Sequence, residues 1–294
     1  MAENKLPWQS KLVLLAVLPF AGTEVVLDCN WWASQAAPVA IWTIGLSALL
    51  GLVTWRVRAA TPAAALTGAV ITASLMFSTV VVPYEPWHSA LVPTLAVALL
   101  AFIATRAGRH KKERLGTAEG RKGRSASQVA ANLGFAALVA SGPVQSWLLD
   151  ALWLPLSVTG GRMPALSWTL ALTALAEAAA DTTSSEIGQV LGGRPRMITS
   201  FKAVDPGRDG AITLAGSLAG VIAAAIVAYA GMWALGGGWI LFEVSCAGAV
   251  FGLFFDSLLG ATLEERGLLN NDAVNFLSTI IAAGFALAML CAMH

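Results

Sequence analysis

Carboxylate side chains lie inside two strongly apolar segments of the chain. The segment LALTALAEAAADTTSSEIG carries Glu177, Asp181 and Ser185 at four-residue intervals, which places them on one face of a helix. Glu186 directly follows Ser185, and the segment FGLFFDSLLGATLEER carries Asp256. A charged side chain in the middle of a membrane costs about 3 kcal/mol even on the most lenient scales. These carboxylates therefore need a functional or a structural reason to be there.

Amide side chains occupy the starts of two further apolar segments. The segment SQVAANLG carries Gln128 and Asn132, and the segment NNDAVNFL carries Asn271 and Asn275. The four-residue spacing in each segment puts both of its amides on one helical face. We expect the four segments to bring their carboxylates and amides to the same face of a membrane.

Two loops rich in Lys and Arg adjoin these segments. They read RAGRHKKERLGTAEGRKGRSAS (106–127) and GGRPRMITSFKAVDPGRDG (192–210), and the second directly follows the first carboxylate segment. Carboxylates can hold Mg²⁺ through their oxygen atoms, and Lys and Arg neutralise phosphate charge. The combination predicts a site that holds a lipid phosphate together with a nucleotide.

Each of these groups also has a structural interpretation. Asp181 and Asp256 can form hydrogen bonds with Ser, Thr and Asn side chains of neighbouring helices. The first basic loop can serve mainly to set the membrane orientation and to contact anionic lipids. Glu177, which lies deeper, fits either a supporting role or helix packing, and Glu24 and Glu243 are interpreted as structural.

The elements that carry these residues have the composition of a membrane protein. Of the 294 residues, 57% are hydrophobic and 12% are charged, and the mean hydropathy is +0.71. The net charge of +1 argues against a nucleic-acid-binding surface. We therefore predict an all-α polytopic membrane protein with about nine helices of the roughly 20 apolar residues that a bilayer requires. The expected spans are 11–28, 38–55, 62–82, 88–105, 127–149, 164–187, 211–235, 239–261 and 272–293.

The Lys and Arg residues predict the orientation of the chain. If the N-terminus is cytoplasmic, every Lys and Arg except Arg162 falls on the cytoplasmic side, as the positive-inside rule requires. The candidate site then lies on the cytoplasmic face of a bacterial-type inner or plasma membrane, and the C-terminus lies outside. We interpret 1–294 as one membrane domain, which is subdivided as follows: four N-terminal spans (1–105), a basic cytoplasmic loop (106–126), and a half that carries the site (127–294) and includes the loop 192–210.

Motifs in the second half of the chain resemble, in order and spacing, a known membrane-protein family. The family contains plant phytyl-phosphate kinase of the vitamin E pathway, animal transmembrane protein 19 and many uncharacterised prokaryotic members. The matching segments are GRSASQVAANLG (123–134), AAADTTSSEIG (178–188), PRMITSFKAVDPGRDGAITLAGSLAG (195–220), and FGLFFDSLLGATLEE with NDAVNFLST (251–265 and 271–279). Thr183 stands where the family often has Trp, and Ala211 stands where a second Gly is common.

The resemblance implies a reaction. A phosphoryl group would pass from a nucleoside triphosphate, with CTP favoured, to a prenyl monophosphate such as phytyl or geranylgeranyl phosphate, in a reaction that requires Mg²⁺. The expected partners are this lipid, the nucleotide and membrane lipids. Alternatives are a lipid cytidylyltransferase or a lipid phosphatase that uses the same site, or a lipid or ion transporter, which Glu24, Glu177 and Glu243 keep open.

The residues and the resemblance together define a candidate site. We assign catalytic roles to Asp181, Lys202 and Asp256, and we assign Mg²⁺ ligation to Asp181, Glu186, Asp209 and Asp256. Binding of the lipid phosphate and the nucleotide is assigned to a larger polar set: Arg124, Gln128, Asn132, Ser185, Arg196, Thr199, Arg208, Asn271 and Asn275.

Overall fold

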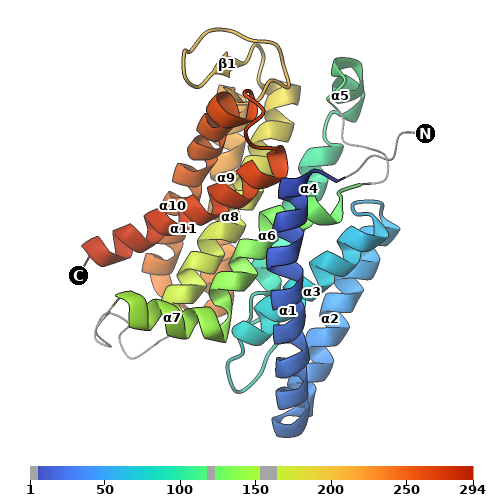
Figure 1. Ribbon diagram of the computed structural model, residues 1–294, viewed down its shortest axis with the longest axis vertical. Helices are drawn as coiled ribbons and strands as arrows, with labels where there is room; N and C mark the ends of the chain where they lie inside the picture. Colours follow the sequence, from blue (N-terminus) through green and yellow to red (C-terminus); the bar gives the residue numbers. More distant parts are fainter. Residues whose placement is uncertain (1–5, 118–122, 153–163, 294) are drawn as a thin grey trace.

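The chain folds into helices joined by short connections (Figure 1). The computed structural model describes residues 6–117, 123–152 and 164–293, so Lys5, Arg121, Lys122 and Arg162 of the orientation prediction lie outside the described residues. The helices of the first half are α1 (Trp8–Gln35), α2 (Ala37–Arg56), α3 (Pro62–Ser78), α4 (Leu91–Arg106), α5 (Arg109–Leu115), α6 (Ala126–Ala140) and α7 (Gly142–Leu152). The second half contains α8 (Pro164–Leu191), the strands β1 (Arg196–Met197) and β2 (Ala211–Ile212), α9 (Leu214–Leu235), α10 (Gly238–Leu259), the π-helix η1 (Gly260–Glu264) and α11 (Asn271–Ala292).

The helices have the length and surface of membrane-spanning segments. Among the described residues, five helices are long and apolar enough to cross a membrane, or six if α4 and α5, which are bent by 63°, form one span. Large apolar side chains are exposed on their outer surfaces, for example Leu15 (67%), Ile41 (68%) and Ile222 (59%). Such a surface is typical of contact with lipid. The helical membrane fold is thus confirmed, while nine crossings and a cytoplasmic N-terminus stay predictions.

The fifth expected span differs from the prediction of one helix over 127–149. The structure ends α6 at Ala140, places Ser141 in an extended conformation and begins α7 at Gly142. Pro143 lacks the backbone N–H that would continue α6, and its ring clashes with the preceding turn. The two predicted basic loops also contain local structure, since the first holds α5 and the second is closed by the antiparallel pairing of β1 with β2.

Helix α8 lies at the centre of the molecule and packs against α4, α6, α9, α10 and α11. In Figure 1 it lies between α1–α3 on one side and α10 and α11 on the other. Small residues let α9 approach it closely: a Cβ added at Gly216 would lie 2.6 Å from the Ser184 carbonyl oxygen, and one at Gly220 would lie 2.9 Å from that of Ala180. Close packing of small residues is how membrane helices associate.

The polar termini of several helices lie at one end of the molecule. Figure 1 shows α5, β1 and the start of α1 at the same end. Ser125 begins α6 there with a capping box that includes Gln128, and Asn270 caps α11 by accepting a hydrogen bond from the Ala273 N–H. Ser10 of α1 donates a 2.6 Å hydrogen bond to Asp272, which ties α1 to the first turn of α11.

We expect Gly216→Ala to lower the stability of the protein by about 1–3 kcal/mol, because the added methyl group would meet the α8 backbone. The measurement is the thermal unfolding midpoint of the detergent-solubilised protein. Gly45→Ala in α2 is the matched control, because nothing lies within 4 Å of a Cβ at Gly45. Equal midpoints for the two variants would contradict the tight α8–α9 contact.

Candidate functional site

A polar pocket of about 780 Å³ lies between α6, α8, α11 and the segments that flank α5 and α6. Eight of its ten lining residues belong to the set assigned from the sequence, and Thr117 and Thr182 are additional. The lining residues are Thr117, Arg124, Gln128, Asn132, Asp181, Thr182, Ser185, Glu186, Asn271 and Asn275. The structure thus brings together carboxylates, amides, hydroxyls and a guanidinium from segments far apart in the sequence.

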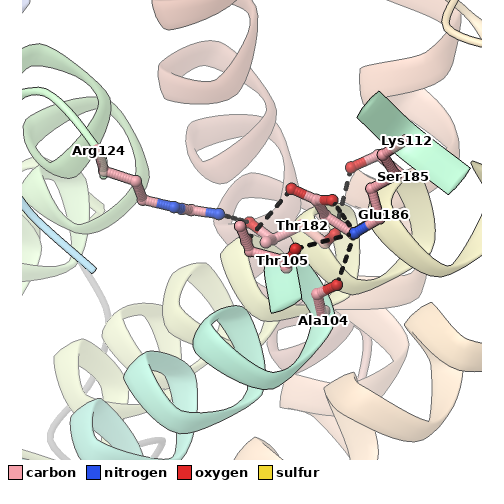
Figure 2. Close-up of polar contacts among 7 residues, drawn as sticks. All are labelled: Ala104, Thr105, Lys112, Arg124, Thr182, Ser185 and Glu186. Atoms are coloured by element: carbon pink, nitrogen blue, oxygen red, sulfur yellow. Dashed lines mark hydrogen bonds and ion pairs between the residues drawn. The ribbon is translucent and has the colours of Figure 1, made fainter. Parts of the chain in front are cut away.

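Arg124 is fixed in the pocket by its backbone. Its N–H donates to the Ala59 carbonyl and its carbonyl accepts from the Thr61 N–H, both at 3.0 Å, so the turn between α2 and α3 holds it. Gly123 has φ +79°, and a Cβ there would lie 2.4 Å from the Ala59 carbonyl carbon. The Arg124 side chain reaches α8, where Nη2 donates to Thr182 Oγ1 at 3.3 Å (Figure 2). Its positive charge also favours the ionised form of a carboxylate nearby.

Glu186 is held by the buried cation Lys112. Both residues lie on the other side of Thr182 from the Arg124 side chain (Figure 2). The Lys112 side chain is 1% exposed, and its Nζ donates to Glu186 Oε2 at 2.5 Å. The same ammonium donates to the carbonyls of Ala104 and Thr105 at the end of α4, at 2.8 and 3.1 Å. Thr105 Oγ1 donates to Glu186 Oε1 at 3.2 Å. Both oxygens of the predicted metal ligand Glu186 are therefore engaged by protein groups.

Asp181 and Asp256 form a carboxyl pair between α8 and α10. Their side chains lie near enough to interact electrostatically, and Asp256 Oδ2 is buried with no hydrogen-bond partner among the described residues. Two carboxylates in contact repel each other unless they share a proton or a cation. The pair fits Mg²⁺, which commonly takes one or two protein carboxylates and completes its shell with water and substrate phosphates. In the described part of the chain, no three acidic, His or Cys side chains gather as a metal site.

The amides of α6 stabilise the start of that helix as well as line the pocket. Gln128 Oε1 accepts from the Ser125 N–H at 2.7 Å, and Asn132 Nδ2 donates to the Gln128 carbonyl at 2.8 Å. Asn271 and Asn275 of α11 line the pocket as well. The amide groups thus combine a structural role with a position at the site.

The residues predicted in the loop 192–210 do not line the polar pocket. The exposed residues of this group are Arg196, Thr199, Lys202, Arg208 and Asp209. Arg196 donates to the Phe201 carbonyl at 2.9 Å, and Arg208 forms an ion pair with Glu265. Partial desolvation and the nearby Glu265 raise the pKa of Asp209. The loop nevertheless borders the pocket, because a Cβ at Gly207 would lie 2.5 Å from Cγ2 of Thr117, which lines it.

Thr182 and Lys112 are site residues that were not predicted, and they differ in how recognisable they are from the sequence. Thr182 directly follows Asp181 in the matched motif, so its position was available from the sequence. Lys112 is one of many cations in a basic run, and nothing in its spacing distinguishes it. Glu177 is buried at 1% exposure and does not line the polar pocket. Glu243 is exposed on α10, beside a separate apolar groove.

Lys112→Met should lower stability by about 3 kcal/mol, because it removes one partner of a buried ion pair. Lys111→Met is the matched control: Lys111 is exposed and makes a single 2.7 Å hydrogen bond to the Val190 carbonyl, so its loss should cost about 1 kcal/mol or less. Thermal unfolding in detergent measures both variants. Equal effects would show that Lys112 does not hold the loop in place.

Comparison with known proteins reveals a family and several relatives. Residues 45–283 match the family described as integral membrane protein DUF92. An uncharacterized membrane protein of Methanocaldococcus jannaschii is 39% identical over 42% of this chain and 53% of its own length. An uncharacterized membrane protein of Synechocystis is 31% identical over 69% of this chain and 74% of its own length.

A plant protein is among the relatives. Protein VTE6, chloroplastic, of Arabidopsis thaliana is 27% identical over 66% of this chain and 56% of its own length. The chain thus spans about half the length of the Methanocaldococcus jannaschii protein and of Protein VTE6. No solved structure matches the chain.

Proposed function

Because this chain belongs to the integral membrane protein family DUF92, as its motifs predicted, we propose that it transfers a phosphoryl group to a prenyl monophosphate in the membrane. The observation that carries this proposal is the polar pocket, which Arg124 and Asp181 both line, with Asp256 of α10 interacting with Asp181 from outside the lining. Carboxylates and cations in one pocket are the groups that phosphoryl transfer requires.

The family supports the class of substrate. The motifs resemble a family that contains plant phytyl-phosphate kinase, and the similarity to Protein VTE6 is distant but extends over 66% of the chain. We therefore propose phytyl or geranylgeranyl monophosphate as the acceptor and a nucleoside triphosphate, with CTP favoured, as the donor. The basic segments at the site end of the molecule favour a cytoplasmic location for this pocket.

In the proposed reaction, an oxygen of the acceptor phosphate attacks the γ-phosphorus of the nucleotide. The bond between that phosphorus and the β,γ-bridging oxygen breaks, and the nucleoside diphosphate leaves. No general base is needed, because the acceptor phosphate is already anionic near neutral pH. Arg124 would orient the phosphates, and Ser185, Asn271 and Asn275 would donate hydrogen bonds to their oxygen atoms.

Mg²⁺ is part of the proposal. It would be held by Asp181 and Asp256 and would neutralise the negative charge of the nucleotide phosphates. Glu186, bonded to Lys112 and Thr105, would shape the pocket wall beside these carboxylates. The exposed cations Lys202, Arg196 and Arg208 would meet the part of the nucleotide that extends beyond the pocket, as would Asp209 and Thr199.

The direct test uses the full-length protein in detergent with geranylgeranyl monophosphate, Mg²⁺ and each nucleoside triphosphate in turn. Mass spectrometry of the lipid should detect the diphosphate, with release of a nucleoside diphosphate. A CDP-lipid with pyrophosphate would instead identify a cytidylyltransferase, and a free alcohol would identify a phosphatase. An unchanged lipid with folded protein would refute the proposal.

Asp181→Asn and Asp256→Asn should each reduce diphosphate formation at least about a hundredfold, because each removes a charge from the carboxyl pair. Glu24→Gln should stay within about twofold of the wild type, because Glu24 of α1 neither lines the polar pocket nor interacts with the Asp181–Asp256 pair. The measurement is the initial rate at saturating lipid, with size-exclusion profiles to verify folding. Wild-type rates in both Asp variants would refute the role of the pair.

A further inference from the structure

A second cavity lies beside the polar pocket, between α2, α3, α4 and α6. Its walls are formed by small and apolar side chains, including Ala64, Gly68, Ala101 and Leu133. We call it the apolar cavity.

The two cavities adjoin each other. Arg124 and Asn132 line both, so the apolar cavity begins where the phosphate-binding groups of the polar pocket end. Arg58, Arg106 and Arg109 also line the apolar cavity. Arg106 is placed at this rim by a 2.7 Å hydrogen bond to the Val57 carbonyl. Positive charge is thus concentrated at one end of a space that small and apolar residues line together with several Thr residues.

The apolar cavity runs along most of α4. Its lining residues on that helix extend from Thr94 to Arg106, which corresponds to about 18 Å at 1.5 Å per residue. This length exceeds half of the roughly 30 Å hydrocarbon core of a bilayer. The shape suits a molecule with a long hydrocarbon chain and one anionic end.

We propose that the apolar cavity binds the isoprenoid chain of the monophosphate substrate, with the phosphate at Arg124. The inference rests on the proposed function and adds to it a place for the chain and a role for α2, α3 and α4. A cavity bounded by α2, α3, α4 and α6 limits the length of the isoprenoid chain that it can hold. Gly68 of α3 lines this cavity, and because glycine has no side chain, it leaves space there for the isoprenoid chain.

Gly68→Leu tests the assignment through chain-length selectivity. The closest atom to a Cβ at Gly68 is Val129 Cγ1 at 3.7 Å, so a Cβ there is accommodated, and we expect the larger side chain to occupy part of the cavity that Gly68 lines. We expect kcat/KM to fall at least tenfold for geranylgeranyl monophosphate and less than threefold for geranyl monophosphate. Gly45→Leu in α2 is the matched control, with no neighbour within 4 Å and no place in the cavity, and should leave both values unchanged.

Equal losses for the short and the long lipid in folded Gly68→Leu protein would overturn the assignment. Should that variant not fold, Gly68→Ala carries the same test with a smaller replacement and an expected loss of about threefold for the long lipid only. The absence of any selectivity in folded Gly68→Ala protein would then overturn it.

A second experiment does not depend on turnover. A geranylgeranyl monophosphate with a photoreactive group at the end of its chain should label peptides of α3, α4 or α6, and Gly68→Leu should prevent this labelling. Labelling of the groove around Phe251 and Phe285 on α10 and α11 would overturn the assignment. The assignment would also be overturned if phosphatidylglycerol competed with the photoreactive probe as well as unlabelled geranylgeranyl monophosphate does, because this would identify a site for ordinary membrane lipids. Labelling of α3, α4 or α6 without any turnover would uphold the cavity and refute the proposed reaction.

Discussion

The ion pair between Lys112 and Glu186 links the surface loop to the central helix. A buried ammonium that loses its partner costs several kcal/mol, so α5 has to stay folded against the ends of α4 and α8. The carbonyls of Ala104 and Thr105 lie at the negative end of the α4 dipole and stabilise the same cation. Thr117, which follows α5, thereby lies at the wall of the polar pocket.

Helix α8 forms the common wall of the site. It carries Asp181, Thr182, Ser185 and Glu186 within two turns, and among the described residues it contacts α4, α5, α6, α9, α10 and α11. Because small residues such as Gly216 allow α9 to pack directly on its backbone, α8 has little freedom to shift. Arg124 reaches it from a segment anchored to the turn between α2 and α3. The phosphate-binding geometry therefore depends on helix packing on both sides of α8.

The proposed binding of the isoprenoid chain gives the N-terminal helices α2, α3 and α4 a role in substrate binding. The motifs singled out in the sequence lie in the second half of the chain, although the family match begins at residue 45, and α2, α3 and α4 line the apolar cavity that adjoins the polar pocket. A binding cavity for a hydrocarbon chain needs space and apolar contacts and makes few demands on particular residue types. This explains why a functional contribution of these helices has no recognisable motif.

The sequence by itself determined the helical membrane character and the polar residues that gather at one end. Apolar length and four-residue spacing are local properties, so they indicated helices and placed Asp181 and Ser185 on one face. The break after Ala140 was also encoded locally, in Gly142 and Pro143, although the apolar run concealed it. Only the tertiary structure decided which cation meets the acidic helix. Lys112 reaches Glu186 across 74 positions of sequence, whereas Lys202 faces solvent, because loop folding and helix packing fix such contacts and residue spacing does not.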